Sequence, residues 1–156
     1  MYLTIDINKF DQKYIFFGEN TINNIIKDSY FSRINYSNDN FTMNGIFIYF
    51  YLHHVNYESN ISWNHKVKCH FNYEKNQYVI KNLVKIEENI LTAFQSHKTP
   101  VFTIEQQLKN NFIKIFNNYN STSSHFIFKI SGIWSNDYSY GISYKFMNTP
   151  NSNFLF

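Results

Sequence analysis

The strongest constraint on the fold of this chain is the stretch HFIFKISGIWSNDYSYGISYKF, residues 125–146. Two runs of alternating residues flank a polar turn, and a period of two is typical of half-buried strands. The stretch therefore predicts an antiparallel hairpin. One face of its first strand is predicted to carry Phe126, Phe128, Ile130, Gly132 and Trp134.

The same pattern places a lysine on the outer face of each strand of this hairpin. With the turn centred on Asp137, Lys129 is predicted to lie opposite Lys145, and Trp134 opposite Tyr140. Two like charges directly opposite each other destabilise a sheet slightly. Their placement is explained if a phosphate chain runs over that face.

A second basic row occurs in the sequence WNHKVKCHFNY. Alternation there predicts a strand with Lys66, Lys68 and His70 on one face and Val67 and Cys69 on the other. Basic rows beside exposed rings hold single-stranded nucleic acid, because lysine neutralises phosphates and each base stacks on a ring for about 1–3 kcal/mol. In the alternative interpretation, the lysines are solvated and the rings belong to the core.

The rest of the chain mixes strand and helix patterns. Strands are predicted over residues 1–7, 14–17 and 112–116, and a hairpin over 31–55. Apolar residues at helical spacing predict helices over 20–30, 79–94 and 103–111. This order indicates an α+β fold, mostly antiparallel, forming an OB-like barrel or a strongly curved sheet with one or two helices. We expect a single domain over 1–147 and a tail over 148–156.

Composition limits the function classes. The 17 Phe and 13 Tyr beside a single Ala indicate A- and T-rich codons, as in some viruses, parasites and endosymbionts. A net charge of +3 is compatible with a polyanionic partner. The single cysteine, Cys69, excludes an intramolecular disulfide, and we find no signal-peptide or membrane-spanning pattern. We expect a soluble intracellular protein without membrane contact.

No pattern in the sequence favours catalysis. His65 and His70 are predicted on opposite faces of a strand, which does not suit a metal site. Cys69 lies among apolar neighbours, as an inert buried thiol does. Glu87 and Glu88 point about 100° apart on a helix, so they do not form a general acid/base pair. We expect no enzyme activity, no metal and no cofactor.

The run FIFKISGIWSNDYSYGISYKF, with MYLTIDINKF and FTMNGIFIYF, resembles small proteins encoded by nucleocytoplasmic large DNA viruses. The closing hairpin is also similar to the last hairpin of viral OB-fold single-stranded DNA-binding proteins, including the phage-type family of giant viruses. By position, Gly132, Ile133 and Trp134 match the turn entry, and the return strand is matched by Tyr140, Gly141, Tyr144 and Lys145. The C-terminal NTPNSNFLF departs from the phage-type pattern, because it ends in an aromatic residue but has no acidic residues.

This resemblance implies an OB-like barrel that coats single strands during viral DNA replication, in the host cytoplasm or nucleus. We therefore expect a non-enzymatic viral protein that binds single-stranded DNA or RNA without sequence preference. The predicted binding residues are cations and rings: Arg33, Trp63, Lys66, Lys68, Lys129, Trp134, Tyr138 and Lys145. The main alternative is a viral structural, assembly or host-interaction protein, such as a minor virion component, that binds protein partners. A third interpretation is an enzyme whose catalytic motif we do not recognise.

Overall fold

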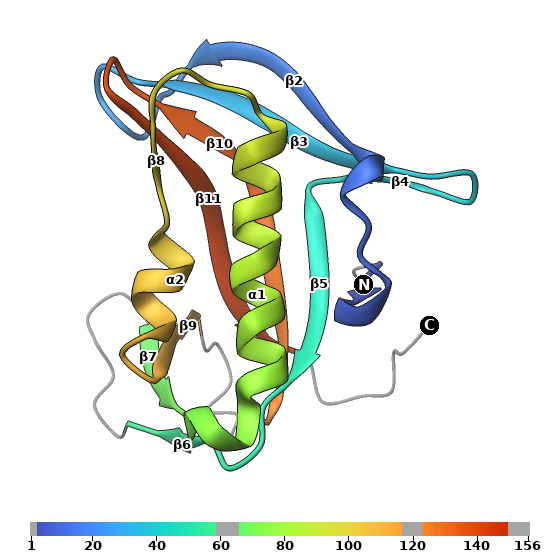
Figure 1. Cartoon of the computed structure of the whole chain (residues 1–156), viewed down its shortest axis with the longest axis vertical. Helices are drawn as coiled ribbons and strands as arrows, with labels where there is room; N and C mark the ends of the chain where they lie inside the picture. The colour runs from blue at the N-terminus through green and yellow to red at the C-terminus, as the bar shows by residue number, and fades with distance from the viewer. Residues whose placement is uncertain (1–2, 59–65, 117–122, 150–156) are drawn as a thin grey trace.

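The computed structural model describes residues 3–58, 66–116 and 123–149, and it has an α+β fold with two α-helices and one curled sheet that does not close (Figure 1). The helices are α1 (Tyr73–Ala93) and α2 (Thr103–Leu108). The strands are β1 (Ile5–Asp6), β2 (Ile15–Ile22), β3 (Tyr30–Ser37), β4 (Thr42–Asn44), β5 (Ile46–Tyr51), β6 (Asn56–Tyr57), β7 (Lys66–His70), β8 (Thr99–Val101), β9 (Phe112–Phe116), β10 (His125–Ser135) and β11 (Ser139–Asn148).

The sheet is built around the closing hairpin, β10 and β11. Its main path runs β1-β5-β10-β11-β9-β7-β6. Strand β3 pairs with the last four residues of β10 and itself pairs with β2 and β4. Most pairs are antiparallel, but β1 with β5, β11 with β8 and β11 with β9 are parallel. The two long central strands thus connect every part of the sheet.

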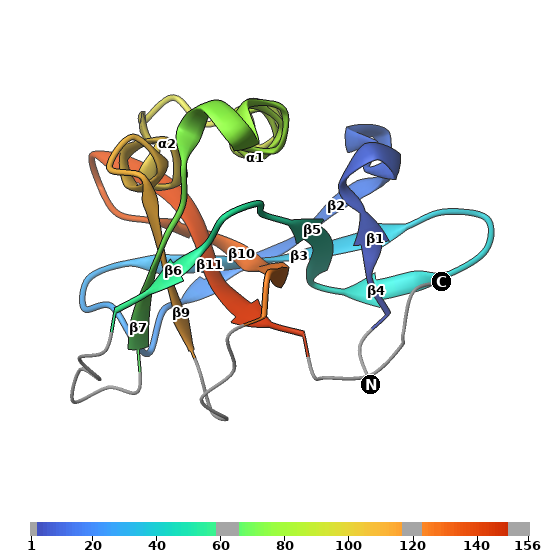
Figure 2. The same cartoon turned by 90° about the horizontal axis from the view of Figure 1, so that it is seen from below.

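Both helices cover one face of this sheet (Figure 2). Helix α1 begins after Asn72, whose side-chain oxygen accepts the backbone N–H of Lys75 and so caps the helix. The helix predicted over 79–94 is therefore confirmed and begins earlier, at Tyr73. Its buried apolar residues pack on the sheet side chains that point toward it, which form the core: Ile46, Ile48, Phe50, Phe126, Phe128, Ile130, Ile142 and Phe146.

The helix predicted over residues 20–30 is wrong. Strand β2 continues to Ile22, and a turn leads into β3. The side-chain oxygen of Asn23 accepts the backbone N–H groups of Ile25 and Ile26, and the Asn23 N–H donates to the carbonyl of Ser29. An Asn side chain that binds nearby amides competes with helix formation, and here it closes a hairpin instead.

The other predicted elements are confirmed, several with changed ranges: β9 has the predicted bounds, and the strand predicted over 14–17 is longer, Ile15–Ile22. The hairpin predicted over 31–55 is divided at Gly45, whose φ of 91° ends β4 before β5 begins. Of the strand predicted over 1–7, the described residues from Leu3 onward contain β1, Ile5–Asp6, which continues into a 3-10 turn over Ile7–Lys9; residues 1–2 lie outside the described residues. The short helix predicted over 103–111 ends at Leu108.

Candidate nucleic-acid interface

The sheet face that points away from the helices carries the cations predicted from the sequence. Alternation in β7, β9, β10 and β11 buries one set of side chains under α1 and α2 and turns the other set outward. We call the outward set of lysines the basic face: Lys66, Lys68, Lys114, Lys129 and Lys145.

Four of these lysines form a continuous row across neighbouring strands. Lys129 on β10 is the register partner of Lys145 on β11, as the sequence predicted. Lys114 on β9 is the register partner of Lys68 on β7. Lys145 and Lys114 come directly before Phe146 and Ile115, which are register partners in the parallel β11–β9 pair. With strands about 4.8 Å apart, the row extends roughly 14 Å across four strands.

Phenylalanine rings lie beneath the ammonium groups of the basic face. Lys68 Nζ lies 4.9 Å from the centroid of the Phe112 ring, and Lys129 Nζ lies 5.2 Å from that of Phe47. The ring of Phe116 lies within reach of two cations, 5.0 Å from Lys66 Nζ and 5.7 Å from Lys145 Nζ. Such cation–π contacts each contribute about 0.5–1 kcal/mol at exposed sites. They hold the lysines over the sheet despite their mutual repulsion.

Carboxylates contribute little to this face. Across the segments that the structure describes, Lys68, Lys114, Lys129 and Lys145 form no ion pair with a carboxylate. Glu58, directly after β6, binds His70 Nε2 on β7 with its carboxylate at 2.7 Å. These lysines therefore carry positive charge that is not neutralised within the described chain, so an anion can approach them.

A β-bulge decides which rings share this face. The ladder between β10 and β11 shifts between Ile130 and Gly132, so that Trp134 pairs with Gly141 instead of Tyr140. The predicted Trp134–Tyr140 pair is therefore wrong, and so is the predicted grouping of Gly132 and Trp134 with Phe126. Because the extra residue reverses the alternation, Gly132 and Trp134 face the same side as Lys129 and Lys145.

The indole of Trp134 lies flat against the strand next to it. A Cβ atom at Gly141 would come within 2.8 Å of the Trp134 ring, and one at Gly132 within 2.6 Å of the Phe31 ring. Phe31 and Trp134 are themselves register partners. These two glycines thus let two rings lie close to the sheet on its open face, where they are half-buried.

The remaining predicted residues lie farther from the lysine row. Arg33 on β3 is exposed and pairs with Gly132, so it shares the open face near Trp134. Tyr138 is 82% exposed but lies in the turn between β10 and β11, beyond the last ladder pair. Trp63 lies outside the described residues. The structure thus brings together Lys66, Lys68, Lys129 and Lys145. Arg33 on β3 and Trp134 on β10 lie farther along the same face.

Sequence reasoning missed Lys114 and the three phenylalanines of this face. The alternation in FIKIF does separate Lys114 from the buried Ile113 and Ile115, so its outward direction could have been predicted. Its place beside Lys145 could not, because β9 and β11 pair in parallel across a long stretch of chain.

The other reactive groups have structural roles. Cys69 is fully buried, and burial raises the pKa of its thiol to about 12. The carboxylate of Glu87 is buried and accepts the backbone N–H groups of Ile104 and Glu105, at 2.9 and 3.0 Å, which caps α2. Burial raises the pKa of Glu87, and these hydrogen bonds oppose the rise.

Neither metal binding nor a membrane-spanning helix is indicated in the part of the chain that the structure describes. There we find no group of three or more His, Cys, Asp and Glu side chains placed to bind a metal ion. No helix within the described ranges is long and apolar enough to cross a membrane. Comparisons with known protein families, curated proteins and solved structures gave no match to this chain. The basic face is therefore the feature from which we infer a function.

Proposed function

We propose that this protein binds single-stranded nucleic acid without sequence preference, and that the basic face is its binding surface. The observation that carries the proposal is the row of Lys68, Lys114, Lys145 and Lys129 across four strands, with rings beneath it. Binding requires no catalytic group, and the proposal assigns none.

The chemistry of the row suits a sugar-phosphate chain. Ammonium groups at neighbouring positions on successive strands can contact successive phosphates, and each contact releases a condensed counterion. Lysine acts as a point charge that binds a phosphate without fixing its orientation. The row therefore favours a flexible polyanion whose phosphates adjust to the sheet.

The rings favour a single strand over a duplex. Phe116 is 38% exposed and the rings of Phe47 and Phe112 are half-buried at the level of the lysines. Once the lysines turn from these rings to phosphates, unpaired bases can stack on the rings, whereas the bases of a duplex are already stacked on each other. Stacking is sequence-tolerant because every base has a π-face, so we expect no sequence preference.

The proposal includes a biological setting. The likeness of the closing hairpin to viral OB-fold single-stranded DNA-binding proteins supports a role in viral DNA replication, in the host cytoplasm or nucleus. A curled sheet with a basic outer face could hold a strand in the way that an OB-like barrel does. We propose this setting together with the binding activity.

The activity is tested by fluorescence anisotropy with a labelled oligothymidylate and a duplex of equal length, each titrated at several salt concentrations. If all five lysines of the basic face contact phosphates, the log–log salt slope for the single strand is about −3.5, from five contacts at about −0.7 each. We expect the single strand to bind more tightly than the duplex. Absence of binding at low salt, or a slope near zero, would refute the proposal.

A second candidate function is that of a viral structural, assembly or host-interaction protein, such as a minor virion component. The observation in its favour is the exposure of Ile22 and Ile25 in the turn between β2 and β3, 76% and 94% respectively. Exposed apolar clusters mark contacts with other proteins. Protein association that is insensitive to salt, without oligonucleotide binding, would support this candidate instead.

A further inference from the structure

Strand β2 forms an edge of the sheet. Within the described ranges it pairs with β3 and with no other strand, and Figure 1 shows it along the upper rim of the molecule. An edge strand leaves a row of backbone N–H and C=O groups available to another strand. Many natural edge strands carry lysine or proline, which hinder pairing, but β2 has neither, and its one charged residue is Glu19. The edge of β2 is therefore open to a further strand.

Two residues at the C-terminal end of β2 point their backbone groups outward. The Asn23 N–H donates to the carbonyl of Ser29, across the turn between β2 and β3. Hydrogen-bonded pairs alternate along an antiparallel ladder, so the backbone of Thr21 also binds β3. The N–H and C=O groups of its two neighbours, Asn20 and Ile22, therefore point away from β3.

Two residues at the N-terminal end of β2 do the same. The carbonyl of Ile34 accepts the N–H of Gly45, which directly follows β4, so the backbone groups of Ile34 face β4 and not β2. Ile34 is the register partner of Phe17. The backbone groups of Phe17 therefore point away from β3, and those of Ile15 follow by alternation.

A bulge between the two ends makes this edge unlike that of a regular strand. The register of β2 with β3 shifts between Phe17 and Asn20, where β2 has one residue more than β3. Within the bulge, the Gly18 carbonyl accepts the hydroxyl of Ser32 at 2.7 Å. Outward residues of a regular strand are two apart, but Phe17 and Asn20 are three apart. A regular partner strand would therefore lose its register at the bulge.

A second copy of β2 has the same three-residue step. Placed antiparallel, it matches all the outward residues at once, because the step then lies at the same place in both strands. We propose that two copies of this chain pair through their β2 strands, about a two-fold axis at the bulge. The register that pairs every outward residue places Ile15 opposite Ile22, Phe17 opposite Asn20, and Gly18 opposite Glu19.

The side chains of the strand agree with this register. Ile22 is 76% exposed in one copy and is covered by Ile15 of the other. Phe16 is 55% exposed and lies opposite Thr21, and such aromatic and β-branched pairs stabilise neighbouring strands. Glu19 lies opposite a glycine, so no like charges are directly opposed. The contact thus covers both exposed apolar side chains of β2.

The symmetry of the contact limits the assembly. Both copies use the same strand, so the contact closes at the dimer. The two-fold axis is normal to the shared sheet, so the helices of both copies lie on one side and both basic faces on the other. A pair of eight-residue strands is a small contact, and interfaces below about 1,200 Å² belong to weak, transient complexes. The inference does not depend on nucleic-acid binding.

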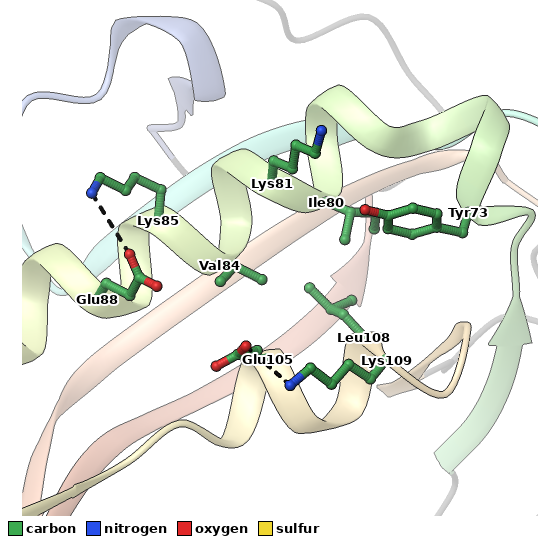
Figure 3. Close-up of a pocket in the computed structure, with 9 residues that line it drawn as sticks. All are labelled: Tyr73, Ile80, Lys81, Val84, Lys85, Glu88, Glu105, Leu108 and Lys109. Atoms are coloured by element: carbon green, nitrogen blue, oxygen red, sulfur yellow. Dashed lines mark ion pairs between the residues drawn. The ribbon is translucent and has the colours of Figure 1, made fainter.

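The groove between α1 and α2 is another apolar surface that a second copy could contact. It has a volume of about 280 Å³, and its apolar floor is formed by Ile80, Val84 and Leu108 (Figure 3). Its two glutamates, Glu88 and Glu105, already bind lysines of their own helices. The groove thus favours no particular occupant, and it provides a control for the edge of β2.

Sedimentation velocity over a wide range of protein concentration, without nucleic acid, tests the proposal. We expect the average mass of the native chain to rise toward that of a dimer and no further. Ile22→Pro removes an N–H that points away from β3, and edge strands tolerate proline at such positions. The dimer loses two hydrogen bonds by symmetry, so its dissociation constant should rise about thirtyfold.

Two matched controls change apolar residues away from this edge. Ile25→Ala alters a residue that is 94% exposed in the turn after β2, and Val84→Gln alters the floor of the groove. Both variants should dimerise as the native chain does. Circular dichroism verifies that these variants and the Ile22→Pro chain fold.

Cross-linking tests the register independently. Phe16 and Thr21 form a non-hydrogen-bonded pair in the proposed contact, with Cα atoms about 4.5 Å apart, which suits a disulfide. A Phe16→Cys chain mixed with a Thr21→Cys chain should therefore form disulfide-linked dimers under mild oxidation. Neither chain should do so alone, because equivalent positions of the two copies lie roughly 17 Å apart along the strands. The native Cys69 is buried.

Each of four results would overturn the inference. The native chain could remain monomeric at all concentrations, or the Ile22→Pro chain could associate as the native chain does. The mixed cysteine chains could cross-link no more than each chain alone. Loss of association in the Val84→Gln chain, with the Ile22→Pro chain unaffected, would place the contact in the groove instead.

Discussion

Replacing Lys129 and Lys145 by glutamine tests the basic face most directly. The two residues are register partners at one end of the lysine row, so the double variant removes two neighbouring phosphate contacts. We expect the log–log salt slope for a single-stranded oligonucleotide to become less steep by about 1.4, from two contacts at about 0.7 each. Extrapolated from 1 M salt, this change weakens binding about tenfold near physiological salt.

The fold should tolerate this double substitution. Removing two lysines that lie opposite each other relieves a small repulsion, while the cation–π contacts with Phe47 and Phe116 are lost. Two lost contacts of about 0.5–1 kcal/mol each exceed the relieved repulsion, so we expect the free energy of unfolding to fall by about 1 kcal/mol. Urea unfolding followed by circular dichroism measures it.

The matched control has the same change in net charge on the other side of the molecule. Lys75 and Lys81 are exposed on α1, which covers the opposite face of the sheet. Their replacement by glutamine should leave the slope within about 0.3 of the native value if only direct contacts contribute. Equal changes of slope in both double variants would refute the reasoning, because net charge rather than the lysine row would then account for binding.

Three further predictions concern the stability and reactivity of the described residues. Gly141→Ala should lower the free energy of unfolding by about 1–3 kcal/mol, because its Cβ would clash with the Trp134 indole; thermal and urea unfolding measure this. Cys69 should resist alkylation by iodoacetamide at pH 8 in the folded protein and react once the chain is unfolded in guanidinium, because burial raises its thiol pKa to about 12; fast alkylation without denaturant would contradict this. The pKa of Glu87 is raised by burial above its usual 4.5, so its contribution to stability is greatest below pH 4.5 and is lost as pH rises through the higher folded pKa. Urea unfolding across this range should therefore show stability falling more in the native chain than in the Glu87→Gln variant, and parallel curves would contradict the assignment.

The face of the sheet on which each side chain lies could be predicted from the sequence more accurately than which strands pair with each other. Alternation correctly separated Lys66 and Lys68 from Val67 and Cys69, because the period of a strand is a local property. The predicted pair of Lys129 and Lys145 is also correct, but the register next to the turn differs from the predicted one by one residue, and the bulge offsets this difference. The pairing of β9 with β11 is not local, and it alone places Lys114 in the row.

Two local features also could not be predicted from periodicity. The turn over residues 23–29 has apolar residues at helical spacing, but the Asn23 side chain binds the amides that a helix would have used. The bulge after Ile130 leaves no mark in the alternation, because Gly132 and Ile133 are compatible with either face. In both places the pattern alone could not distinguish between two structures.

That bulge has a consequence for how this chain tolerates change in length. Ser131 is the extra residue of β10, so its deletion would let Gly132↔Ser143 follow Ile130↔Tyr144 directly in a regular ladder. Ile133 would stay buried, and Trp134 would stay on the same side as Lys129 and Lys145. Strand β11 has no such extra residue, so the loss of a residue from its middle would turn every side chain beyond the gap to the other face. A variant library of this hairpin would then contain forms shortened in β10 and none shortened in β11.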